Sequence, residues 1–67
     1  MNNLTIQTKI LEVANVWAAH EIHRIDLNIL NINGEKEYRA RVFEEDNRIF
    51  DIIISESTEH VTIKTVQ

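Results

Sequence analysis

The string His20-Glu21-Ile22-His23 holds residue types that bind zinc, because two imidazoles and a carboxylate fall within four positions. Its spacing differs from H-E-x-x-H, in which the two histidines are four residues apart on one helix face. On a helical wheel both His20 and His23 fall on the polar side, where surface histidines ordinarily lie. We therefore expect solvated side chains here and no metal site.

Three consecutive acids, Glu44, Glu45 and Asp46, form a second cluster, and they supply too few oxygen ligands for a calcium or magnesium loop. Phe43 and Ile49 flank the acids on what should be one face of a hairpin. Carboxylates at a tip attract a basic partner, and a few apolar anchors hold it. The sequence thus predicts a partner-binding site at Phe43, Glu44, Glu45, Asp46 and Ile49, with the acids forming a solvated tip.

The chain lacks the residues that covalent and phosphate chemistry usually need. It has no cysteine and one glycine, so it offers neither a thiolate nucleophile nor a glycine-rich phosphate loop. Ser55 and Ser57 occupy positions typical of turn formers. We expect a protein that is not an enzyme and has no catalytic residues, metal or other cofactor.

Charge and hydropathy narrow the choice of partner. Eleven acids against seven bases give a net charge of −4, which repels nucleic-acid phosphates. Arg39 and Arg41 share a face with Phe43, as in sheets that bind single strands, but Asp26 and Asp51 should neutralise Arg41. No apolar run approaches the ~20 residues of a membrane span. We expect a cytoplasmic protein whose partner is another protein with a basic surface, with no direct nucleic-acid contact and no membrane.

The elements that position these side chains begin with a helix. Apolar residues recur with a helical period over about residues 4–21, on an arc half the circumference wide. Trp17, Ile10 and Ile6 lie on that arc, and Trp17 is the largest of its side chains. We therefore expect Trp17 to be buried against the inner face of the sheet, and its truncation to cost more than that of any other residue, about 3–5 kcal/mol.

After residue 23 the apolar period changes to two, which predicts four strands at about residues 24–32, 36–44, 48–55 and 60–66. Asn33-Gly34 is the signal of a two-residue hairpin and fixes the first register. Asn47 in the left-handed conformation suits the second turn, whereas the third turn has no such marker. Registers that keep the apolar residues on one face also align four charges of alternating sign on the other, which cross-strand pairing favours: Asp26, Arg41, Asp51 and Lys64.

These elements predict an α+β fold in two layers, with the N-terminal helix packed on a four-stranded antiparallel meander and residues 1–67 forming a single domain. The core of a domain of this size contributes about 3–5 kcal/mol, and such domains commonly add a disulfide, a metal or a partner chain. Because the chain has no cysteine, we expect a homodimer, for which the weakly protected last strand is one candidate edge.

The functional expectation is a small non-enzymatic protein-binding module. Its size, acidity and richness in Asn and Ile are typical of phage and mobile-element products that inhibit a host nucleic-acid-handling protein, an analogy of class and not of sequence. Two alternatives stay open: an immunity or antitoxin-type protein, and a small-ligand binder whose pocket is shared between two protomers.

Overall fold

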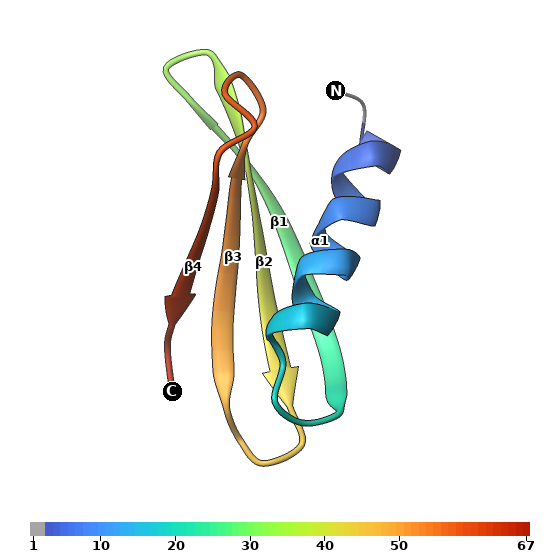
Figure 1. Ribbon diagram of the computed structural model, residues 1–67. Coiled ribbons are helices and arrows are strands. Elements are labelled where there is room, and N and C mark those ends of the chain that lie inside the picture. Colours follow the sequence, from blue (N-terminus) through green and yellow to red (C-terminus); the bar gives the residue numbers. More distant parts are fainter. Residues whose placement is uncertain (1–2) are drawn as a thin grey trace.

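The computed structural model describes residues 3–67 and places one helix across one face of a four-stranded antiparallel sheet (Figure 1). The strand order β1-β2-β3-β4 follows the sequence, so the sheet is a meander, and the predicted α+β two-layer fold is confirmed. The elements are α1 (Asn3–Trp17), β1 (Ile22–Ile32), β2 (Glu35–Glu44), β3 (Ile49–Ser55) and β4 (Val61–Thr65).

The turns set the strand registers as the sequence predicts. Asn33 and Gly34 both have positive φ, 52° and 81°, so the two-residue turn places Ile29 opposite Tyr38. Asn47 has a φ of 69° in the second turn, and Val42 pairs with Phe50 beyond it. Short turns of defined handedness therefore fix which residues of β1, β2 and β3 share a face.

The third turn uses a residue that no turn preference marks. Glu59 takes a φ of 58°, and its N–H donates to the Ser55 carbonyl at 2.8 Å. The Ser55 N–H donates to the His60 carbonyl at 3.2 Å and closes the hairpin. Ile54 then faces Val61, as predicted, although a left-handed glutamate is uncommon. The apolar alternation of the two strands is what identifies this register from sequence.

The core lies between α1 and the two central strands. Ile6, Ile10 and Ala14 are 0–3% exposed and form one row along the helix, spaced four residues apart. They pack on the inner face of β2 and β3, which supplies the other buried residues: Tyr38, Ala40, Val42, Phe50, Ile52 and Ile54. The helix thus covers the middle of the sheet, and the inner face of β1 stays partly open at Leu27 and Ile29.

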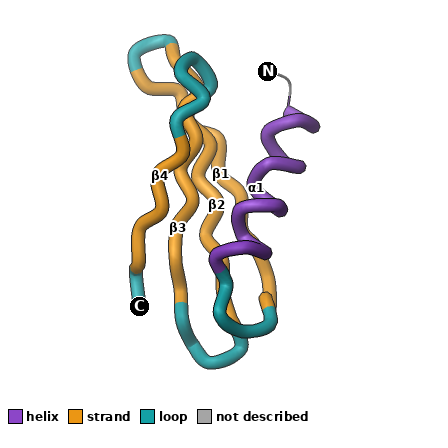
Figure 2. The backbone as a smooth tube through the Cα atoms, viewed as in Figure 1, coloured by secondary structure: helices purple, strands orange, loops and turns teal. Residues whose placement is uncertain are grey.

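Two expectations about the helix are wrong. The helix ends at Trp17 instead of near residue 21, and the Trp17 side chain is 52% exposed instead of buried. The row that contacts the sheet is narrower than the apolar arc of the wheel, so Trp17 lies on the flank near Val13 and Ile63. After α1, the chain turns back toward β1, as the tube in Figure 2 shows.

The predicted charge row on the outer face is confirmed. In the strand registers, Asp26 lies opposite Arg41, Arg41 opposite Asp51, and Asp51 opposite Lys64. Arg41 donates from Nε and Nη2 to the two Asp51 oxygens at 2.9 and 3.0 Å. These hydrogen bonds hold the pKa of Asp51 below its usual value, against the opposing effect of desolvation. The Arg41–Asp51 hydrogen bonds therefore join β2 to β3 on the side away from the helix.

The core geometry predicts which truncation unfolds the protein. Ile52 is fully buried, so Ile52→Ala should cost about 2–5 kcal/mol, comparable with the whole stability of a small domain. Trp17→Ala should leave the fold intact because half of its side chain is already in water. Thermal melts followed by circular dichroism measure both variants. A folded Ile52→Ala beside an unfolded Trp17→Ala would contradict this packing.

Candidate functional site

The β2–β3 hairpin tip meets the loop between α1 and β1, and a buried carboxylate joins them. Glu44, at the end of β2, is 4% exposed. Its Oε1 accepts the backbone N–H groups of Ala19 and His20, both at 2.9 Å. Its Oε2 lies 3.9 Å from Nε of Arg48, which compensates its charge. The carboxylate therefore supplies acceptors for two loop amides that follow the helix.

This position corrects the prediction that Glu44 belongs to a solvated tip. The alternation of β2 places Tyr38, Ala40 and Val42 on the inner face, and Glu44 continues that series. The alternation of side chains along β2 therefore already indicated that Glu44 points inward, even though the residue is charged. The Glu44 carboxylate is thus held inside the fold by contacts of its own chain.

The two remaining acids of the tip differ in their surroundings. Asp46 Oδ2 lies 3.0 Å from Nε2 of His20, and its Oδ1 accepts the Arg48 N–H at 3.3 Å. The Glu45 side chain is exposed and has no ion pair or hydrogen bond within residues 3–67, while its N–H donates to the Glu21 carbonyl at 3.0 Å. Glu45 is thus the acid of the tip that remains available to solvent.

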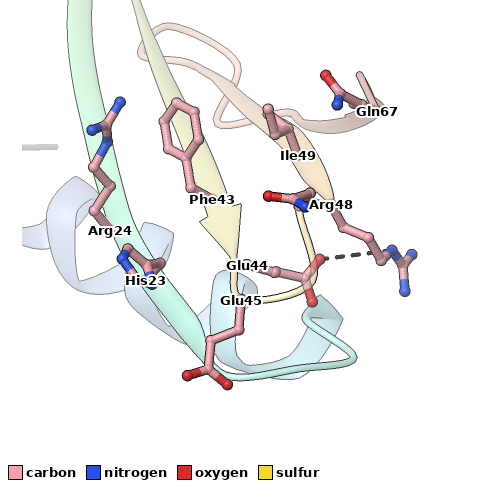
Figure 3. A pocket seen from close by; sticks show the side chains of 9 residues that line it. His23, Arg24, Phe43, Glu44, Glu45, Arg48, Ile49 and Gln67 are labelled. Carbon is pink, nitrogen blue, oxygen red and sulfur yellow. Dashed lines mark ion pairs between the residues drawn. The ribbon is translucent and has the colours of Figure 1, made fainter.

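A pocket of about 270 Å³ opens on the outer face beside this tip; we call it the tip pocket (Figure 3). Phe43 and Ile49 face each other in the β2–β3 register and supply its apolar side chains. The guanidinium carbon of Arg24 lies 4.2 Å from the centroid of the Phe43 ring, a cation–π contact. Arg48 and Glu45 lie at the border of the pocket, toward the turn.

The structure thus brings together four of the five predicted site residues around one surface. Phe43, Glu45 and Ile49 line the tip pocket, and so does the buried Glu44. Asp46 lies in the adjoining turn. The predicted site did not include the other five lining residues, which are His23 and Arg24 of β1 together with Asn47, Arg48 and Gln67. The register alone places Arg24 opposite Phe43, so that neighbour was available from the first hairpin.

The tip pocket combines two apolar side chains with cationic, anionic and amide groups. An apolar patch bordered by cationic, anionic and amide groups can hold an apolar side chain and orient the polar groups around it. Within residues 3–67, no three His, Cys, Asp or Glu side chains are grouped closely enough to hold a metal ion. No buried side-chain nitrogen or oxygen in the same part of the chain lacks a hydrogen-bond partner.

Comparisons of the chain with known protein families, curated proteins and solved structures found no match. In the described part of the chain, α1 is too short and too polar to cross a membrane.

The neighbouring glutamates provide a matched test of the buried carboxylate. Glu44→Gln keeps the size of the side chain but replaces two charge-assisted hydrogen bonds with weaker neutral ones, so it should lower the free energy of unfolding by about 1–3 kcal/mol. Glu45→Gln should change it by less than about 0.5 kcal/mol, because that side chain is exposed. Urea titration measures both, and equal effects would contradict the structural role of Glu44.

Proposed function

We propose that this protein is a non-enzymatic protein-binding module and that the tip pocket receives its partner. The observation that carries the proposal is the placement of Phe43 and Ile49, which pair on the outer face and belong to no part of the buried core. Binding energy at protein interfaces concentrates in a few aromatic and aliphatic anchors surrounded by polar groups. Phe43 and Ile49 are such anchors, and the charged side chains beside them form the rim.

The charges around the tip pocket support a partner with basic groups. Arg24 is engaged by the Phe43 ring and lies 3.4 Å from Asp26, and Arg48 faces the buried Glu44. Glu45 has no such partner among residues 3–67, and the whole chain has a net charge of −4. Charge complementarity of this kind acts mainly on the rate of association and on the choice of partner. It also disfavours direct binding of nucleic acid.

We further propose that the module acts as an inhibitor in the cytoplasm, encoded by a phage or mobile element and directed at a host protein that handles nucleic acid. A basic surface is what such a target presents, because it must attract phosphate groups. The absence of cysteine from the chain suits a reducing compartment. An inhibitor of this kind works by occupying a surface, which requires anchors and no catalytic groups.

A comparison of two apolar-to-serine variants tests this function. The partner is captured from cells that make the chain, purified, and titrated by calorimetry against the parent, Phe43→Ser and Val16→Ser. Phe43→Ser should weaken binding at least about 10-fold through loss of a central anchor. Val16, 85% exposed on the helix, is the matched control and should leave Kd unchanged. Equal affinities for Phe43→Ser and the parent would overturn the tip pocket as the binding site.

A further inference from the structure

Strand β1 is an exposed edge with little protection against pairing with another strand. It is the longest strand, with 11 residues, and within residues 3–67 it has a neighbour on one side alone (Figure 1). From Leu27 to Ile32 it contains no charge and no proline, the devices that usually keep sheet edges apart. Its large apolar side chains are 36–48% exposed: Leu27, Ile29, Leu30 and Ile32. The other edge, β4, has five residues and one of them is Lys64.

Hydrogen bonds of β2 show which way its backbone groups point. The Lys36 carbonyl accepts the Glu56 N–H at 3.0 Å, and the Glu44 N–H donates to the Arg48 carbonyl at 2.9 Å. Both bonds run to the β3 side of the sheet, and both start from even-numbered residues of β2. Because backbone groups alternate along a strand, the odd-numbered residues of β2 direct theirs toward β1.

The register carries this alternation across to β1. Asp26 is opposite Arg41, so the even-numbered residues of β1 bond to β2. The odd-numbered residues Ile25, Leu27 and Ile29 therefore direct their N–H and C=O groups away from the sheet. The same three side chains lie on the helix side, where Leu27 and Ile29 are partly uncovered. One edge thus offers free backbone groups and apolar side chains together.

We propose that a second copy of this chain pairs with β1 in antiparallel fashion, about a two-fold axis at Leu27. Leu27 then faces Leu27 of the second copy, and Ile25 faces Ile29 of the second copy. All of these pairs join odd-numbered residues, as the outward backbone groups require. The proposal does not rest on the proposed function, although Arg24 of β1 belongs both to this edge and to the lining of the tip pocket.

Charge and polarity favour the register centred on Leu27 over the registers centred on Asp26 and on Asn28. With Leu27 at the axis, Asp26 faces Asn28 and Arg24 faces Leu30 of the second copy, so no like charges are opposed. Centring the pair on Asp26 would oppose two carboxylates directly, which is destabilising. Centring it on Asn28 would place the polar Asn31 against Ile25 on the apolar side.

In the register centred on Leu27, the closest like charges of the two copies are the Asp26 carboxylates, and nearby cations reduce their repulsion. The two Asp26 carboxylates come to lie diagonally across the axis, and each already has a cation near it. Arg24 Nη2 lies 3.4 Å from Asp26 Oδ2, and Arg41 is opposite Asp26 in β2. Their repulsion is therefore largely compensated within each copy.

Pairing in this register covers apolar surface on the helix side. Residues directly opposite each other in a sheet point to the same face, so both copies of α1 lie on one side of the joined sheet. A groove of about 220 Å³ runs between α1 and β1, lined by Leu11, Leu27 and three neighbours. Two such grooves become adjacent at the axis, which removes Leu27 and Ile29 from water. This supplies the added stability that a small domain without disulfides needs.

Single-cysteine variants test the register, because the chain has no cysteine of its own. Facing residues of this type lie about 5.5 Å apart between Cα atoms, within the range of a disulfide. Leu27→Cys, oxidised at tens of micromolar, should give mostly covalent dimer on a non-reducing gel. Ile25→Cys and Ile29→Cys should each stay largely unlinked alone and should link when the two are mixed.

The mass of the unmodified chain, measured by light scattering over the same concentrations, completes the test. A dimer mass together with the Leu27→Cys disulfide supports the proposal. A monomer at hundreds of micromolar would overturn it and leave the β1 edge to a strand of another protein. Equal self-linking of all three cysteine variants would overturn the register. So would a dimer that Thr65→Pro dissociates, since that residue lies on the opposite edge.

Discussion

The buried carboxylate of Glu44 is the interaction on which the arrangement of this small protein depends. A charge in the interior is costly unless hydrogen bonds and a counter-charge compensate it, and here two loop amides and Arg48 do so. Because those amides belong to Ala19 and His20, the same carboxylate fixes where the chain turns after the helix. Glu44 also lines the tip pocket, in which the β1–β2 register places Arg24 beside Phe43. One side chain thus couples the end of α1 to the geometry of the tip pocket.

Most of the sheet could be predicted from sequence because two independent signals agree. The Asn33-Gly34 turn allows one register, and the apolar alternation of the strands requires the same one. The charge row through Arg41 and Asp51 then follows without further assumption. The buried residues of the helix were harder to predict. A helical wheel shows which side chains form the apolar face, but not how much of that face the sheet covers. Trp17 lies outside the covered part, and the central strands fill the core without it.

The predicted site residues lie close together in the structure, but Glu44 is buried where a solvated side chain was expected. Sequence shows three adjacent acids and cannot show their partners, which come from segments distant in the chain. Glu44 is satisfied by loop amides, and Asp46 by His20. What remains at the surface is a pocket with two apolar side chains, Phe43 and Ile49, and one acid, Glu45, that has no ion pair or side-chain hydrogen bond within residues 3–67. The proposed function therefore depends more on its apolar anchors than on electrostatic attraction.

Amide hydrogen exchange, followed residue by residue with NMR, tests the role of Glu44 most directly. Ala19 and His20 lie outside every helix and strand, so their amides have no regular hydrogen-bond partner. If the carboxylate holds them, both should exchange at least about 10-fold more slowly than amides of the exposed turn at residues 33–34, because exchange requires local opening. Exchange at Ala19 and His20 as fast as in that turn would show that Glu44 does not join the helix end to the hairpin tip.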